Sequence, residues 1–111
     1  MSTKSTKVDL ATDSNGFAVQ VLGPVGNANG TAGATHSEIA LPTGTNPGDI
    51  VRVYCEVDSY VEFGQTGVEA GTSSMIHPAG VEFYKVPPNA GYLGVERVGT
   101  ADGKVSCTQM R

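Results

Sequence analysis

Few side chains in this sequence belong to types that could perform catalysis, and their spacing argues against it. The histidines are His36 and His77. A metal site in a small β-domain would place paired histidines on one strand, whereas His36-Ser37-Glu38 offers one histidine and one carboxylate. His77 directly precedes Pro78, which suits the end of a strand. We therefore expect both histidines to take surface or partly buried positions rather than to bind a metal.

The sequence gives equally little support for a nucleophilic or an acid–base catalytic site. No serine lies in a Gly-x-Ser-x-Gly elbow, so no Ser-His-Asp triad is predicted. Glu56, Asp58 and Glu62 fall close together across an expected hairpin and could divide acid and base roles, as in glycosidases. A glycosidase also needs a deep cleft, for which this chain has few residues, so we favour a solvated polar face shared with Arg52.

The segment Asp13-Ser14-Asn15-Gly16 resembles part of a calcium loop. It lacks the later acidic ligand at the required spacing, so a turn is favoured. We predict no catalytic residue, no metal site and no cofactor.

The composition favours short strands joined by tight bends. A chain of 111 residues supports one core and one domain. Charged residues make up only 16% of the chain, against about 25% in an average globular domain. The 15 glycines and 6 prolines give turns unusual weight.

The charge pattern disfavours nucleic acid as a ligand. The formal net charge is −4, from 11 acids and 7 bases that are scattered along the chain. A phosphate backbone is bound by a concentrated basic face. No apolar run approaches the length of a membrane span, and no signal peptide is recognisable, so we expect a soluble protein made in the cytoplasm.

Two regions are distinguished by periodicity. Residues 1–15 are rich in Ser, Thr, Lys and Asp and show neither the apolar alternation of a strand nor the apolar period of a helix. This predicts a flexible N-terminal arm. Residues 16–111 form the predicted single β-sandwich domain, which begins with a strand over 17–22. The glycine-rich segment 26–33 is predicted to be a flexible loop or hairpin tip, because its residues are too small to pack a core.

The clearest element is the strand over 50–57. Val51, Val53, Cys55 and Val57 alternate with polar residues, which is the period of a half-buried strand. Cys55 and Cys107 both fall on apolar phases, so buried free thiols are favoured over a disulfide.

Turn signals divide the rest of the domain into short strands. A dense turn over 42–49 follows an extended segment at 35–41. Asp58-Ser59 and Asp102-Gly103 are each predicted to close a hairpin. In the strand over 81–86, Val81, Phe83 and Val86 are expected to point inward. The remaining strands are expected at 60–63, 68–70, 75–77, 92–98 and 104–110. The spacing predicts an all-β, jelly-roll-like sandwich of seven or eight short antiparallel strands with no helix.

Binding, rather than catalysis, is the expected activity, and three groups of residues are candidates for it. A sugar could stack on exposed aromatic rings, although tyrosines on half-buried strands more often cap a core or an interface. The candidate partner-binding residues are Lys4 and Lys7 in the arm, Asn27 and Asn29 in the glycine-rich segment, and Tyr54, Tyr60, Tyr84 and Tyr92.

The second half of the chain resembles a known family. The run Val53 to Gly64, the bend Ile76 to Val81, and the closing segment Gly103 to Thr108 resemble small β-rich accessory proteins of tailed bacteriophage particles. The resemblance covers residues 50–111. With its length and strand count, the chain is most similar to the capsid decoration, or staple, proteins of epsilon fifteen-like short-tailed phages.

This resemblance implies a structural role in the virion. A decoration protein binds the outer surface of the capsid and clamps neighbouring major capsid subunits, so the implied partner is the major capsid protein, with a possible homodimer on the capsid. The family carries no catalytic residue to transfer to this chain. The alternatives are a phage tail or head-completion component, or a carbohydrate-binding β-sandwich module.

Overall fold

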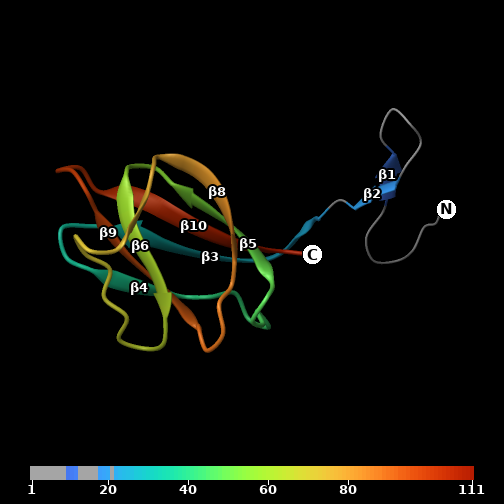
Figure 1. Ribbon diagram of the computed structural model, residues 1–111. Coiled ribbons are helices and arrows are strands. Elements are labelled where there is room, and N and C mark those ends of the chain that lie inside the picture. The colour runs from blue at the N-terminus through green and yellow to red at the C-terminus, as the bar shows by residue number, and fades with distance from the viewer. Residues whose placement is uncertain (1–9, 13–17, 21) are drawn as a thin grey trace.

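The computed structural model describes residues 10–12, 18–20 and 22–111, and these contain strands but no helix. Eight strands form two four-stranded antiparallel sheets (Figure 1). The first sheet has the order β3-β10-β5-β8, with bounds Pro24–Ala32, Gly103–Met110, Ile50–Cys55 and Gly80–Lys85. The second sheet has the order β4-β9-β6-β7, with bounds Ser37–Ala40, Tyr92–Arg97, Ser59–Gly64 and Met75–His77.

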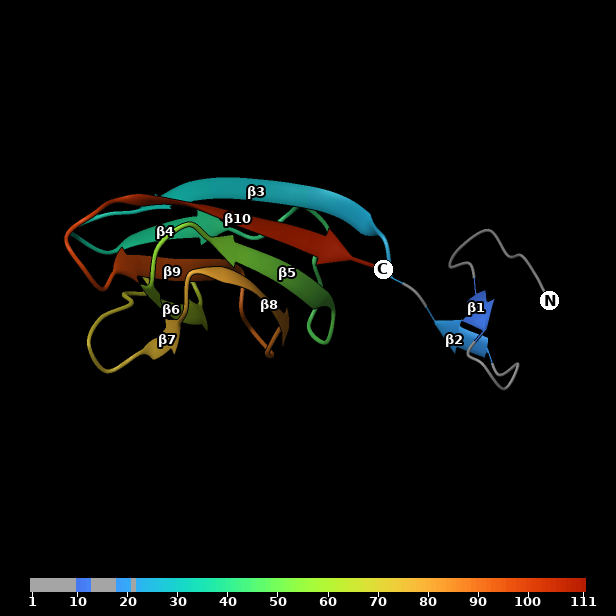
Figure 2. The same ribbon diagram turned by 90° about the horizontal axis from the view of Figure 1, so that it is seen from above.

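The strand pairs are nested along the chain. The pair β6–β7 is innermost, and β5–β8, β4–β9 and β3–β10 enclose it in turn. The chain is thus one long hairpin, rolled so that successive pairs fall into alternate layers (Figure 2). Two further ladders, β10–β5 and β9–β6, join the pairs within each sheet. This is jelly-roll order, so the predicted jelly-roll-like sandwich is confirmed.

A separate two-stranded sheet precedes the sandwich. It consists of β1, Leu10–Thr12, and β2, Ala18–Gln20, which pair antiparallel and with neither larger sheet. Most of the expected arm over 1–15, including Lys4, Lys7 and the segment 13–16, lies outside the described residues. The strand predicted over 17–22 corresponds to β2.

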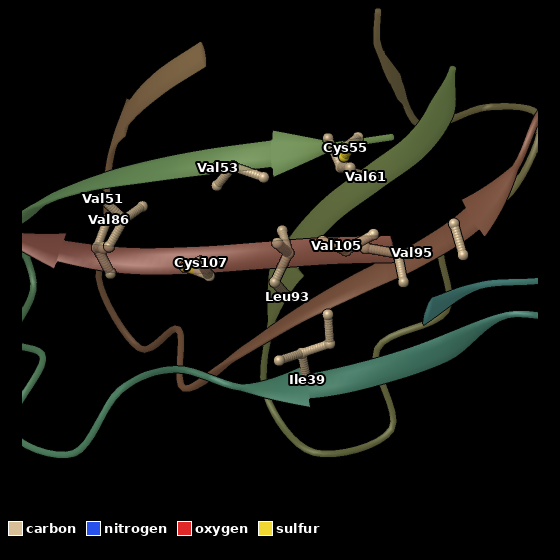
Figure 3. Packing of buried hydrophobic residues seen from close by; sticks show 11 residues of the cluster. Ile39, Val51, Val53, Cys55, Val61, Val86, Leu93, Val95, Val105 and Cys107 are labelled. Carbon is tan, nitrogen blue, oxygen red and sulfur yellow. The ribbon is translucent and has the colours of Figure 1, made fainter. Parts of the chain in front are cut away.

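The core is an aliphatic layer between the two sheets. The predicted alternation over 50–57 is confirmed, since Val51, Val53 and Cys55 are buried. The central strand β10 contributes Val105 and Cys107 on the same side. Figure 3 shows these side chains meeting those of the second sheet, which are Ile39, Val61, Leu93 and Val95.

Both cysteines are free and buried, as the sequence predicts. In the ladder between β5 and β10, Cys55 lies opposite Val105 and Cys107 lies opposite Val53, so the two thiols are diagonal neighbours. Diagonal residues are about 7–8 Å apart, beyond the usual Cα separation of a disulfide. Burial raises the pKa of both thiols, that of Cys107 to about 11.

The predicted loop over 26–33 is wrong, because residues 26–32 belong to the nine-residue edge strand β3. Ala28, Gly30 and Ala32 alternate with more exposed polar residues and face the second sheet. A Cβ atom on Gly30 would lie 2.6 Å from the Ile39 side chain. The small residues are therefore what allows β3 to lie so close to the other layer.

The predicted hairpins at Asp58-Ser59 and Asp102-Gly103 are also wrong. Each turn carries the chain from one sheet to the other, between β5 and β6 in the first case and between β9 and β10 in the second. Turn-forming residues reverse the chain but do not determine which layer the next strand joins. The predicted strand over 68–70 is part of the β6–β7 loop instead.

The close packing of β3 on β4 makes Gly30 a test of the fold. We expect Gly30→Ala to lower the free energy of unfolding by about 1–3 kcal/mol, because the added methyl group overpacks against Ile39. Urea unfolding measures this loss. Gly99→Ala is the control, since a Cβ atom there meets nothing within 4 Å. Equal stability of the two variants would contradict the packing described.

Candidate interaction surface

The two long sides of the sandwich differ in how their edge strands are protected. On one side β3 lies against β4 and β9: the Ser37 hydroxyl on β4 donates to the Thr31 carbonyl at 3.1 Å, and the Arg97 amide on β9 donates to the carbonyl of Gly33, just after β3, at 3.0 Å. On the other side β7 and β8 are the outermost strands of their sheets, follow one another through Pro78-Ala79 and form no ladder with each other. The sandwich is therefore closed along β3 and β4 and open along β7 and β8.

The open side collects exposed apolar side chains. Seven large apolar side chains among the described residues are exposed, and four of them belong to these two strands. Phe83 and Val81 on β8 are 58% and 39% exposed, and Met75 and Ile76 on β7 are 48% and 55% exposed. We call β7 and β8, with these four side chains, the open edge.

The inward orientation predicted for Val81 and Phe83 is therefore wrong, whereas that of Val86 is confirmed. Tyr84, not Phe83, faces the core, where its ring meets Phe63 edge-on at 5.8 Å between centroids. Because successive residues of a strand point to opposite faces, Tyr84 and Val81 cannot both face inward. The buried hydrogen bond of Tyr84 holds this side chain on the inner face of β8, so Val81 and Phe83 lie on the outer face, in solvent.

That hydrogen bond joins the two strands of the open edge. His77 on β7 is fully buried, which corrects the surface or partly buried position expected for it. Its Nε2 lies 3.0 Å from the Gly80 carbonyl and its Nδ1 lies 2.8 Å from the Tyr84 hydroxyl. A carbonyl can only accept, so Nε2 donates to Gly80 and Nδ1 accepts from Tyr84. Burial raises the pKa of Tyr84, and the Glu82 charge adds to this, so the hydroxyl keeps its proton.

The backbone of β8 is also available on the open side. The Glu56 amide donates to the Lys104 carbonyl at 2.8 Å, so alternate residues of β5, from Tyr54 back to Ile50, direct their backbone groups toward β10, and the residues between them direct theirs toward β8. Along an antiparallel ladder hydrogen-bonded pairs alternate with unbonded ones. Val81, Phe83 and Lys85 consequently direct their N–H and C=O groups away from β5. Such an edge can accept an extended segment of another chain.

The outer face of the first sheet is uncovered; it is polar over β3 and β10, whereas Val81 and Phe83 make it apolar at β8. The Asn27 Oδ1 accepts hydrogen bonds from the Ser106 and Thr108 hydroxyls, at 2.9 and 2.7 Å. Asn27 Nδ2 donates to Asn29 Oδ1 at 2.9 Å. We call these four residues the polar ladder. Tyr54 lies beside it on the same face, opposite Ser106.

The outer face of the second sheet is covered by the chain's own loop, residues 65–74. A Cβ atom on Gly94 would lie 3.3 Å from both Val68 and Ala70. Glu38 Oε2 accepts from the Gly67 amide at 2.9 Å, which holds the loop to β4. Only one of the two sheets thus presents a bare face.

The predicted binding residues separate into different environments. Asn27, Asn29 and Tyr54 lie together on the bare face. Tyr84 is a half-buried bridge in the interior, and Tyr60 and Tyr92 are half-buried on the second sheet. Sequence reasoning missed the open edge, because it placed Val81 and Phe83 in the core.

The predicted polar face shared by Glu56, Asp58, Glu62 and Arg52 is not one cluster. Each of the three carboxylates accepts a hydrogen bond from a different segment: Glu56 from the Lys104 amide, Asp58 from the Ala79 amide, and Glu62 from the Ser74 hydroxyl. The described residues contain no group of three or more His, Cys, Asp or Glu side chains able to hold a metal ion. The exposed His36 lies 3.6 Å from Glu69.

One end of the sandwich is held by Asp49. Its Oδ2 accepts from the Asn46 amide at 2.9 Å, from Gln109 Nε2 at 3.0 Å and from Arg111 Nη2 at 3.3 Å. The Asn46 hydrogen bond is the largest cause of a lowered pKa for Asp49, which partial burial opposes. Arg111 and Gly23 exchange two backbone hydrogen bonds of 2.8 Å, so the segment before Gly23 leaves the sandwich at this end.

Comparison of the chain with known proteins finds no matching family model, no similar curated protein and no similar solved structure. Among the described residues, no helix is long and apolar enough to cross a membrane.

The hydrogen bond between His77 and Tyr84 predicts a loss of stability when the Tyr84 hydroxyl is removed. We expect Tyr84→Phe to lower the free energy of unfolding by about 1–3 kcal/mol, because it leaves the buried His77 Nδ1 without a donor. Urea unfolding followed by circular dichroism measures the change. Tyr92→Phe removes a hydroxyl without a hydrogen-bond partner among the described residues and should leave stability unchanged. Equal effects of the two substitutions would refute the bridge.

The Asp49 site predicts a loss of stability in acid. The carboxyl pKa is lower in the folded state than its ordinary value of 3.8, so its stabilising effect is complete above that value. This contribution is lost as the pH falls through the folded-state pKa. We expect Asp49→Asn to flatten this part of the plot of unfolding free energy against pH. Glu82→Gln, which changes a carboxylate without a hydrogen-bond partner in the described part of the chain, should reproduce the wild-type curve.

Proposed function

We propose that this chain is a virion structural protein that binds the outer surface of a bacteriophage capsid and clamps neighbouring major capsid subunits. The observation that carries the proposal is the open edge, where exposed apolar side chains and free strand backbone occur together on a molecule that protects its other edges. The resemblance of residues 50–111 to phage decoration proteins names the partner.

The composition of the open edge suits a protein partner. Aromatic residues and methionine are enriched at protein interfaces, and a small apolar centre rimmed by polar groups is their usual arrangement. Phe83 and Val81 supply an apolar centre on β8, the exposed Glu82 and Lys85 supply part of the rim, and Ile76 and Met75 add exposed apolar side chains on the neighbouring strand β7 of the other sheet. Residues of β8 also offer backbone groups that would add directional hydrogen bonds to the contact.

The shape of the sandwich supports a clamp. The segment before Gly23 leaves at the end where Arg111 lies, and the open edge runs along one side of the sheets. Two contacts on different parts of a rigid domain could engage two neighbouring subunits, which is what a clamp requires. The net charge of −4 would also limit association with the packaged genome.

Binding to heads that lack this protein tests the proposal. We expect saturable binding of the full chain to expanded, undecorated phage heads, and a higher temperature of DNA release from decorated heads. Phe83→Ser should weaken binding at least tenfold, because a mostly buried aromatic side chain at an interface contributes more than about 1.4 kcal/mol. Phe83 is exposed in the free chain, so the substitution should not reduce its stability.

Val25→Ser is the control, since Val25 on β3 is 56% exposed but lies on the closed side. It should bind heads as the wild-type chain does. Binding to isolated tails and not to heads would instead identify a tail component, and loss of binding in both variants would exclude the open edge as the specific contact.

A further inference from the structure

The bare face of the first sheet contains a shallow depression beside the polar ladder. Its volume is about 500 Å³, and it is lined by Asn29, Gly30, Thr31, Tyr54, Lys104, Val105 and Ser106. Those residues come from β3, β10 and β5, so regular strands with fixed register hold the depression. A site on paired strands is positioned more rigidly than one on loops.

Several polar groups at the depression have unused hydrogen-bonding capacity. Asn29 Oδ1 accepts from Asn27, whereas no partner among the described residues accepts from its Nδ2. The Thr31 and Tyr54 hydroxyls and the Lys104 ammonium group likewise have no partner in the described part of the chain. The depression therefore combines amide, hydroxyl and ammonium groups with the wall of one exposed aromatic ring.

The lining of the depression contains one charged side chain, that of Lys104. The Lys104 amide donates to Glu56 Oε1 at 2.9 Å, so a carboxylate lies near the lysine that lines the site. The other lining side chains are uncharged. A polyanion would need several unopposed bases, which these residues do not provide. The site consequently suits a neutral ligand.

A neutral saccharide has both properties that this lining can recognise. Its hydroxyl groups donate and accept hydrogen bonds, which amide and hydroxyl side chains can satisfy. The C–H groups on one side of a sugar ring carry slight positive charge and can pack on the negative face of an aromatic ring. Tyr54 provides such a face, and Asn29, Thr31 and Ser106 provide the polar groups.

From this lining we infer that the bare face binds a neutral oligosaccharide in the depression between Tyr54 and β3. This activity is distinct from capsid binding in its ligand class and in the polar groups of β3 and β10 that it uses, although Tyr54 lies directly opposite Val81 of the open edge in the β5–β8 ladder.

A printed array of neutral and acidic oligosaccharides, probed with the full labelled chain, tests the inference. We expect binding to at least one neutral oligosaccharide, with the affinity confirmed in solution by calorimetry. Tyr54→Ala should weaken that binding about tenfold or more, whereas Tyr54→Phe, which keeps the ring, should retain most of it.

A second pair of variants separates the site from general effects on the fold. Thr31→Val removes a hydroxyl from the lining at nearly constant shape and should weaken binding severalfold, and Thr100→Val, in the exposed β9–β10 turn, should not. Binding of acidic oligosaccharides alone, no binding anywhere on the array, or binding that Tyr54→Ala leaves intact would overturn the inference. Because no capsid is present, these results do not depend on the proposed head-binding function.

Discussion

The position of β10 between β3 and β5 determines most of what this molecule presents to its surroundings. Each residue of the strand has a side chain on one of two faces, so Val105 and Cys107 enter the core while Ser106 and Thr108 join the polar ladder. A shift of the strand by one residue would exchange the two sets. The register is held at one end by Gly103, packed against Val57, and at the other by the buried Gln109, bound to Asp49.

Where the apolar alternation is strong, the sequence is sufficient to predict the strand and its buried face. Val51, Val53 and Cys55 alternate with polar residues, and β5 forms there with the expected face buried. The same period exists in β3, but it alternates Ala and Gly with Asn and Thr, so hydrophobicity does not reveal it. The choice of small residues depends on how near Ile39 approaches Gly30, which is a distance between segments and not a local property.

The prediction of the candidate surfaces from the sequence is limited for a similar reason. Tyr54, Asn27 and Asn29 are near one another, as a binding face requires, but only the ladders of β10 with β3 and β5 bring them together. The exposure of Phe83 was not predictable from hydrophobicity, because an apolar residue in a strand is normally expected to be buried. It is exposed because Tyr84 meets His77 and Phe63 in the interior, and those contacts are made between strands and are not visible in the pattern of residues 81–86 itself.

The nesting of the strand pairs also affects the order in which the protein can assemble during synthesis. The ladder partner of β3 is β10, so β3 leaves the ribosome long before the strand that pairs with it. At about 5–20 residues per second, the delay is on the order of 4 to 15 s. A strand rich in Val, Ile and Phe would be prone to associate with other nascent chains during that time. The Asn, Gly, Thr and Ala residues of β3 give it little tendency to do so. Its composition therefore limits association while the strand is unpaired, and it also allows close packing in the folded protein.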